Sequence, residues 1–543
     1  MTKMTAGKAV VEALIAQGVD TVFGIISIHT LHVYDALRDA EEAGRIRFVG
    51  ARHEHALSFM ADGYARVTGK PGVLLTSGGP GAADSVGAMG ESYHSSVPLL
   101  QITAEIESEL VGSGRGVTHE AKDQMTMFES VTGWRAVASS PQDVPNQIAA
   151  AFDHLRSEHP RPAVLAVPTD YFAKEADMEI MPARAPRTPD PDQALLEQAA
   201  KLLSGAKRPM IIAGAGAMSA AAELRTLAER YGIPVAAADG GKGAFPEDHP
   251  LSLGTVLGGR VWLDNPVQDY AGTCDVVIAV GTSLPFRSTS GVGLQLPEQL
   301  IHVDVDPSMF GRNYPAKVGI AGDARAVISG LLEALDGMSH PPGREAEIAA
   351  LKAASRASLE AQFPNELRAW EAVRASIDRD AIVVCDSTIP GYMGTRCFQA
   401  LEPRSYHHPH GWVSIGYGFA ASLGAKVAAP DRQVVCVTGD GGFQYNIQEL
   451  ASAAQYGIAP VVLVFNDNAW GVLQRYQKTQ FGERYFATAL QNPDFGQLAG
   501  AYGADYTLVD SSDALGAALR DIGKPSRLHL VEVAMPDGFV NLP

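Results

Sequence analysis

Short apolar runs alternate with helix-like stretches along the whole chain, and this alternation is the feature that most restricts its fold. GVLLTS (72–77), VPLLQIT (97–103) and PAVLAVP (162–168) are mostly apolar and do not alternate regularly with polar residues. Strands of this kind are buried on both faces, as they are in parallel sheets covered by helices. The sequence therefore predicts an α/β fold of doubly wound parallel sheets.

Two proline-containing stretches divide this pattern into blocks. MPARAPRTPDPDQ (181–193) and LDGMSHPPGREAE (335–347) both read as linkers. A chain of 543 residues has room for three or four domains at about 150 residues each. We expect three α/β domains, at 1–180, 190–336 and 351–543.

Charge and composition argue against several classes of partner. The net charge of −18 disfavours nucleic acid and anionic membranes. No apolar run approaches the ~20 residues of a membrane span, and the N-terminal stretch lacks the apolar core of a signal peptide. The cysteines show no CxxC spacing and are expected to be buried thiols of a cytoplasmic protein; they are Cys274, Cys385, Cys397 and Cys436.

The segment VVCVTGDGGFQYNIQEL (434–450) places an acidic side chain where a strand turns into a helix. Such a glycine-rich turn presents free backbone N–H groups to an anion. Asp440 would repel a bare phosphate, but a divalent cation could bridge the carboxylate and a diphosphate. The segment therefore predicts that Asp440 binds Mg²⁺ and that the ion holds a pyrophosphate.

A second loop offers more oxygen ligands. The helix after GDGG leads to the strand PVVLVF and then to NDNAWG (466–471). A parallel βαβ unit brings the carboxyl ends of its two strands together. Asp467 and the Ala469 carbonyl are thus candidate ligands of the same ion. The alternative is a plain tight turn beside an unrelated loop.

Together these two loops resemble the cofactor motif of thiamine-diphosphate enzymes related to acetolactate synthase, in which GDG is followed at a set spacing by Asn-Asn. The resemblance extends through ARHEHALSFMADGYARVTG to the family's pyrimidine-binding domain, and through RPMIIAGAGAM and CDVVIAVGTS to its central domain. GWVSIGYGFAASLGAKVA stands ahead of the diphosphate motif, as in the family. This chain departs from the family at Asp467, where Asn is usual.

The resemblance implies roles for particular residues. Glu54 would protonate the aminopyrimidine ring of thiamine diphosphate, and a glutamate in a mostly apolar pocket has a raised pKa suited to sharing a proton. Ile415 would be the apolar wedge that bends the cofactor. The implied metal ligands are Asp440, Asp467 and Ala469. The implied cofactor-binding residues are Ser77, Gly78, Gly79, Pro80, Thr388, Ile389, Ser414, Ile415, Gly439, Asp440, Gly441, Gly442, Asp467, Ala469, Trp470, Gly471 and Val472.

Two histidine-bearing segments are candidates for substrate chemistry. In GRGVTHEAKDQM, His119 and Glu120 stand where acetolactate synthases carry Gln-Glu, and we expect His119 to face the thiazolium from the neighbouring subunit and to move a proton. Alternatively, His119 only orients Glu120 or closes the loop. In FGIISIHTLHVYDAL, His29 is a candidate substrate contact or a surface residue. Here Ile26, Ser27 and His29 replace the usual Gly-Ile-Pro-Gly turn.

The central block carries half of a dinucleotide fingerprint. Gly214 and Gly216 follow a strand, but Ser219 stands at the third glycine position. FAD or ADP is possible here but not favoured, because GTSLPFRSTSGVG lacks the charged run that acetolactate synthases place beside their flavin. Three aspartates could hold a ribose or serve as turn residues; they are Asp304, Asp306 and Asp323.

The resemblance implies a thiamine-diphosphate- and Mg²⁺-dependent enzyme that cleaves or forms a C–C bond beside a carbonyl, as a 2-oxo acid decarboxylase or carboligase. One alternative is the 2-hydroxyacyl-CoA lyase or oxalyl-CoA decarboxylase type, with an acyl-CoA substrate. Another is an inactive cofactor-binding subunit. The family also implies a homodimer or homotetramer with active sites between subunits.

Overall fold

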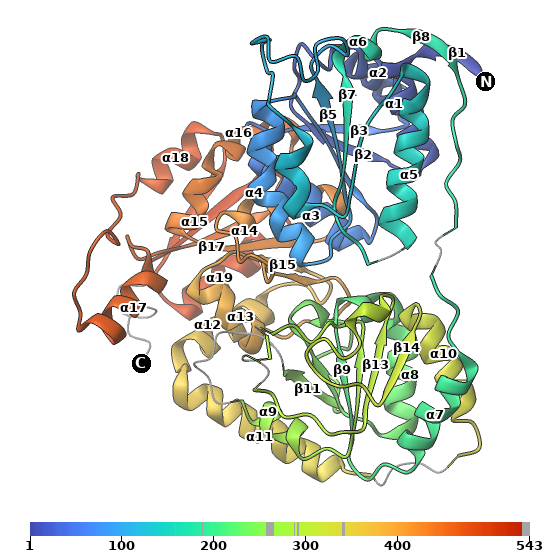
Figure 1. The fold of residues 1–543 in the computed structure, drawn as a ribbon. Coiled ribbons are helices and arrows are strands. Elements are labelled where there is room, and N and C mark those ends of the chain that lie inside the picture. The colour runs from blue at the N-terminus through green and yellow to red at the C-terminus, as the bar shows by residue number, and fades with distance from the viewer. Residues whose placement is uncertain are drawn as a thin grey trace.

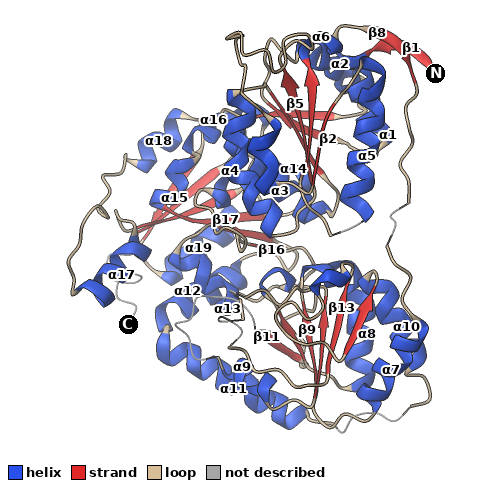
Figure 2. Ribbon diagram, viewed as in Figure 1, coloured by secondary structure: helices blue, strands red, loops and turns tan. Residues whose placement is uncertain are grey.

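The structure is a computed structural model of the chain. It describes residues 1–157, 159–185, 188–256, 265–286, 288–289, 291, 293–338 and 343–534. Three six-stranded parallel sheets, each flanked by helices, make up these residues (Figures 1 and 2). The predicted α/β fold with three doubly wound parallel sheets is confirmed.

The N-terminal sheet has the order β3-β2-β4-β5-β7-β6. Its strands are β2 (Thr21–Gly24), β3 (Arg47–Gly50), β4 (Gly72–Thr76), β5 (Leu99–Glu105), β6 (Trp134–Val137) and β7 (Ala163–Pro168). Its helices are α1 (Ala6–Ala16), α2 (Leu31–Glu42), α3 (Glu54–Thr68), α4 (Pro80–His94), α5 (Val144–Ser157) and α6 (Thr169–Phe172). The predicted strands GVLLTS, VPLLQIT and PAVLAVP are β4, β5 and β7, whose residues are all buried.

The central sheet has the order β11-β10-β9-β12-β13-β14, in which the strand order reverses between β9 and β12. Its strands are β9 (Pro209–Ala213), β10 (Val235–Ala237), β11 (Ser252–Thr255), β12 (Val276–Val280), β13 (Leu300–Asp304) and β14 (Val318–Ala321). Its helices are α7 (Gln193–Ser204), α8 (Ala221–Tyr231), α9 (Pro266–Gly272) and α10 (Ala324–Ala334).

The C-terminal sheet has the order β16-β15-β17-β18-β20-β19, the same winding as the N-terminal sheet. Its strands are β15 (Ile382–Cys385), β16 (Tyr406–His407), β17 (Val434–Gly439), β18 (Val461–Asn466), β19 (Asp505–Val509) and β20 (His529–Ala534). Its helices are α12 (Pro364–Ser376), α13 (Ile389–Cys397), α14 (Tyr417–Ala428), α15 (Asp440–Tyr445), α16 (Leu450–Tyr456), α17 (Gly471–Phe481), α18 (Phe495–Ala501) and α19 (Ser512–Ile522).

Two buried helices join the N-terminal and C-terminal sheets. Helix α3 packs directly on α14, so segments more than 350 residues apart lie side by side (Figure 1). A Cβ at Gly63 would lie 2.0 Å from the Ala421 carbonyl oxygen, and one at Gly424 would lie 1.8 Å from the Met60 carbonyl oxygen. The two backbones therefore touch, and only glycine permits this approach.

Two features were not predicted. A small antiparallel sheet pairs β1 (Thr2–Thr5) with β8 (Glu175–Met178) at the two ends of the N-terminal unit. Helix α11 (Glu345–Gln362) begins inside the second predicted linker, whose residues 339–342 lie outside the described residues. Ile348 of α11 packs in the core of the central sheet and Leu359 in that of the C-terminal sheet, so α11 bridges the two units.

Among helices of the described residues, none has the length and apolar character needed to cross a bilayer. The four cysteines are free and buried, as expected.

Candidate active site

The GDGG turn lies at the carboxyl end of β17, where α15 begins. Asp440 is the first residue of α15, and its side chain is buried. Its Oδ2 accepts a hydrogen bond of 2.6 Å from the Asn492 side-chain amide. A Cβ at Gly441 would lie 2.5 Å from the ring of Trp470. The turn therefore requires glycine where the NDNAWG loop crosses it.

Asp467 directly follows β18, which pairs with β17 so that Phe465 lies opposite Gly439. Burial and, second to it, the neighbouring charge of Asp440 together raise the pKa of Asp467 to about 7. Burial also raises the pKa of Asp440. The two carboxylates are thus brought together, as predicted, in a setting that disfavours their charge.

The donor set at this sheet edge fits a hard divalent cation. The Ala469 N–H donates to Asp467 Oδ1 at 3.2 Å, and Ala469 pairs with Ala489 across the loop. The buried carboxylate of Asp440 and the half-buried one of Asp467, beside a fixed backbone segment, offer the oxygen ligands that Mg²⁺ prefers. A cation would also remove the repulsion that raises the pKa of Asp467.

The other predicted residues of this half surround the carboxylates. A Cβ at Gly439 would lie 2.9 Å from Thr388 Oγ1. A Cβ at Gly471 would lie 2.4 Å from Asp467 Oδ2 and 3.7 Å from Ile389 Cδ1. The structure thus groups one set of predicted residues at a single edge of the C-terminal sheet: Thr388, Ile389, Gly439, Asp440, Gly441, Gly442, Asp467, Ala469, Trp470, Gly471 and Val472.

Ser414 and Ile415 lie in the loop that precedes α14. Both side chains are half-buried. The loop is held from the C-terminal sheet by Asp386, whose carboxylate accepts the N–H groups of Gly416 at 3.0 Å and Gly418 at 3.2 Å. Burial raises the pKa of Asp386 to about 6.

The second half of the candidate site is in the N-terminal unit. Glu54 is the first residue of α3 and is half-buried. Its Oε1 lies 3.0 Å from the position of a Cβ at Gly81, which identifies the glycine turn as one wall around the carboxyl group. Burial raises the pKa of Glu54, as expected for a carboxyl that shares a proton.

Two histidines from other loops lie against the loop Ser77–Pro80. The Ser77 hydroxyl lies 3.4 Å from His29 Nδ1 and 3.2 Å from His119 Nδ1. His119 Nδ1 also lies 3.0 Å from the Gly78 carbonyl oxygen. Gly79 has a φ of +57°, and a Cβ there would lie 2.6 Å from the His119 carbonyl oxygen. His29 and His119 therefore meet at the predicted pyrimidine loop.

Glu120 turns away from this cluster in the structure. Its carboxylate accepts hydrogen bonds from the N–H groups of Gly114 at 2.8 Å, Gly116 at 2.7 Å and Val117 at 3.0 Å. These backbone bonds lower the pKa of Glu120. In this conformation Glu120 stabilises its own loop, while His119 bonds to Ser77 and Gly78.

Several residues with evident positioning roles were missed from the sequence. Asn492 bonds Asp440 and also donates to Asn466 Oδ1 at 2.9 Å. Buried Glu449 accepts the Arg52 N–H at 3.0 Å, two residues before Glu54. Asn492 and Glu449 lie far in the chain from the residues they hold, so no local pattern indicates them. Asp386 does follow a buried strand, and that position was an available signal.

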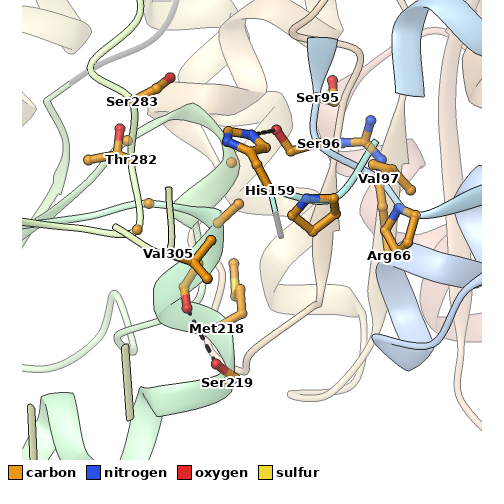
Figure 3. Close-up of a pocket in the computed structure, with 18 of the residues that line it drawn as sticks. Arg66, Ser95, Ser96, Val97, His159, Met218, Ser219, Thr282, Ser283 and Val305 are labelled. Atoms are coloured by element: carbon orange, nitrogen blue, oxygen red, sulfur yellow. Dashed lines mark hydrogen bonds between the residues drawn. The ribbon is translucent and has the colours of Figure 1, made fainter. Parts of the chain in front are cut away.

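A separate cavity of about 750 Å³ lies where the three units meet. Figure 3 shows His159 and Ser96 on one side of it and Thr282, Ser283 and Val305 of the central unit on the other. His159 and Ser96 are hydrogen-bonded to each other.

Most of the residues singled out in the central block line this cavity. They are Gly214, Gly216, Ser219, Asp304 and Asp323. Burial raises the pKa of Asp304 to about 6, while Asp323 caps α10. Asp306 instead lies 3.5 Å from His159 Nδ1.

Comparison with known proteins assigns both halves of the candidate site to domains of one enzyme family. Three family models match the chain: the thiamine pyrophosphate enzyme N-terminal TPP binding domain at residues 4–127, the central domain at 196–331 and the C-terminal TPP binding domain at 390–533. Glu54, Ser77 and His119 lie in the first match, and Asp440 and Asp467 in the third.

The chain is also similar to curated proteins over nearly its whole length. A probable 2-ketoarginine decarboxylase of Pseudomonas aeruginosa is 38% identical over 98% of this chain and 94% of that protein. A probable acetolactate synthase large subunit of Methanocaldococcus jannaschii is 32% identical over 98% of this chain and 92% of that protein. An acetolactate synthase large subunit of Corynebacterium glutamicum is 32% identical over 95% of this chain and 84% of that protein. The chain belongs to the thiamine pyrophosphate enzyme family.

Proposed function

We propose that this protein is a thiamine-diphosphate-dependent enzyme that removes CO₂ from a 2-oxo acid. The remaining acyl carbon then either takes up a proton and leaves as an aldehyde or is joined to a second carbonyl. The main support for the proposal is the pair of neighbouring strand-end carboxylates, buried Asp440 and half-buried Asp467, inside the matched cofactor-binding domain. The half-buried Glu54 argues against the alternative of an inactive cofactor-binding subunit, because such a subunit needs no proton-carrying group at the pyrimidine ring.

The diphosphate end of the cofactor would be held at the C-terminal sheet. Asp440, Asp467 and the Ala469 carbonyl would ligate Mg²⁺, and backbone N–H groups of the GDGG turn would face the phosphates. Asp467 adds a negative charge where the family has Asn, so we expect retention of the diphosphate to depend strongly on the metal.

Thiamine diphosphate, when bound, supplies a nucleophilic carbon and an electron sink for the bond beside the carbonyl. Glu54 would hold and return a proton at the pyrimidine ring. Ile415 would press on the cofactor and keep it bent. His29, His119 and Ser77 would face the substrate, where the pair of imidazoles can give or accept a proton.

We propose that the two halves of each site come from different copies of the chain, in a homodimer or homotetramer. Large apolar side chains are exposed beside both halves, which supports an interface there. On the N-terminal unit these are Ile26, Ile28 and Leu31; on the C-terminal unit they are Leu473, Phe481 and Phe486. The domain limits that we propose for each copy remain 1–180, 190–336 and 351–543.

The relatives suggest how to order the candidate substrates. Similarity to a probable 2-ketoarginine decarboxylase puts a 2-oxo acid with a cationic end first. Similarity to acetolactate synthases puts pyruvate, with and without a second 2-oxo acid, next. We also propose that the protein acts in the cytoplasm and does not need a flavin. Full activity of purified protein that lacks flavin absorbance would support independence from flavin.

The test is turnover of a panel of 2-oxo acids with added thiamine diphosphate and Mg²⁺. CO₂ release that requires both additions supports the proposal, and analysis of the carbon product separates simple decarboxylation from ligation. An acyl-CoA panel run in parallel is the comparison. Turnover of acyl-CoA substrates alone, or no turnover of either panel by cofactor-loaded protein, would overturn it.

A further inference from the structure

A buried glutamate of the N-terminal unit is hydrogen-bonded to the backbone of the loop that precedes Ile415. Glu91 lies on α4 and is fully buried. Its Oε1 accepts the Gly411 N–H at 2.9 Å, and its Oε2 accepts the N–H groups of Trp412 at 2.9 Å, Val413 at 2.9 Å and Ser414 at 3.4 Å. One carboxylate thus collects four consecutive backbone amides from the segment immediately before Ile415.

The loop 411–414, which Glu91 holds, has a backbone conformation that its sequence does not favour. Val413 has a φ of +60°, a left-handed conformation that is an outlier for a β-branched residue. The Ser387 hydroxyl donates to the Val413 carbonyl oxygen at 2.6 Å, while Glu91 accepts the N–H of the same residue. Such strain persists only where the surroundings fix the backbone, and it concentrates at functional sites.

The loop also packs closely on α4. A Cβ at Gly90 would lie 2.4 Å from the Trp412 ring, and one at Gly411 would lie 2.7 Å from His94 Cβ. Asp386 holds the far side of the loop through Gly416 and Gly418. Ile415 therefore stands between two buried carboxylates that belong to different domains.

Several neighbouring groups stabilise the ionised form of Glu91. Burial alone would raise its pKa, but Arg66, His410, Ser95 and the Gly411 N–H more than offset burial, and the pKa lies below its ordinary value. Arg66 Nη2 lies 3.8 Å from Glu91 Oε1, and the Ser95 hydroxyl donates to that oxygen at 2.7 Å. The carboxylate is therefore ionised, as strong acceptance from four amides requires.

We propose that Glu91 is a positioning residue for the reaction, which fixes the strained loop 411–414 so that Ile415 keeps its place against the cofactor. The inference rests on the proposed role of Ile415. Helix α4 starts at Pro80, directly after the pyrimidine loop, and reaches Glu91 three turns later. One rigid helix thus sets both the glycine turn and the Ile415 loop.

The first measurement is hydrogen–deuterium exchange of the chain with thiamine diphosphate and Mg²⁺, in wild type and Glu91→Gln. The glutamine keeps the size of the side chain but removes the charge and turns an N–H₂ group toward N–H donors. We expect the amides of 411–414 to exchange faster in the variant. Unchanged protection of these amides would overturn the proposal.

The second measurement is the exchange of the cofactor's C2 proton with solvent, together with kcat and KM for a turned-over 2-oxo acid. A displaced Ile415 should slow proton exchange and kcat in parallel, by roughly 10- to 100-fold, while KM changes little. A role in folding alone would lower thermal stability but leave both rates normal in loaded protein, and that result would also overturn the proposal.

Two further variants separate the outcomes. Glu366→Gln makes the same change at a buried glutamate of α12 away from the loop and should alter neither rate. If Glu91→Gln does not fold, Ser387→Ala loosens Val413 from the other side without leaving a buried charge, and should give a smaller effect of the same kind. Wild-type protein with no C2 proton exchange would instead refute the proposed function.

Discussion

The imidazole rings of His29 and His119 lie against each other, with 4.3 Å between their centroids, above the Ser77 hydroxyl. They come from loops about 90 residues apart, so only the fold brings them together. Two adjacent imidazoles resist carrying charge at the same time. The pair is therefore suited to holding one proton and passing it on.

His119→Gln should lower kcat while KM for the 2-oxo acid is largely kept, because glutamine cannot exchange a proton. A general acid–base group contributes roughly 10²–10⁴-fold. The pH profile of kcat should change, because the variant removes one of the two titratable rings. Full turnover with an unchanged pH profile would make His119 a spectator.

The same variant should also shift the titration of His29. Burial first, and then the adjacent His119 charge, lower the pKa of His29. Removing the second cause should raise that pKa toward its ordinary value, so His29 should gain its proton at a higher pH than in wild type. NMR titration of the ring checks this, and an unmoved pKa would show that the two rings are not coupled.

Glu54→Gln should keep the fold and cofactor binding but slow the exchange of the cofactor's C2 proton, because an amide cannot carry the pyrimidine proton. The expected loss is roughly 10²–10⁴-fold. Exchange at the wild-type rate would remove Glu54 from the reaction.

Asp440→Ala should abolish the Mg²⁺-dependent retention of thiamine diphosphate, measured by equilibrium dialysis. Asp467→Asn should keep most activity, because an amide oxygen still ligates the ion. Asp467→Ala should weaken the binding of both metal and cofactor. Wild-type affinity in Asp467→Ala would show that Asp467 is not a ligand.

Gly424→Ala should destabilise the folded chain by at least about 1–3 kcal/mol, because the new methyl group would force apart two helices in backbone contact. Gly500→Ala is the matched control on a helix: a Cβ there meets nothing within 4 Å, so we expect a neutral or slightly stabilising change. Thermal unfolding of both variants is the measurement. Equal midpoints would contradict the α3–α14 packing.

The sequence predicts the parallel sheets because fully buried strands have a local signature. VPLLQIT and GVLLTS show it, and they form β5 and β4. The pairing of β1 with β8 has no such signature, since the two strands are short and distant in the chain. The same reasoning found Asp440 and Asp467 at the ends of adjacent strands.

What could not be predicted depends on contacts between distant segments. Glu91 of the N-terminal unit accepts backbone N–H groups of the C-terminal unit, and Glu449 of the C-terminal unit accepts the Arg52 N–H of the N-terminal unit. Asn492 reaches Asp440 from a loop 52 residues away. Glu120 has the residue type of a catalytic group, but backbone amides of its own loop take up its carboxylate.

The central claim is that this chain uses thiamine diphosphate to act on 2-oxo acids, and CO₂ release tests it most directly. Purified chain should release CO₂ from at least one member of the 2-oxo acid panel only when thiamine diphosphate and Mg²⁺ are both present, and Glu54→Gln should release it far more slowly. No CO₂ from any 2-oxo acid by protein shown to hold the cofactor would contradict the account.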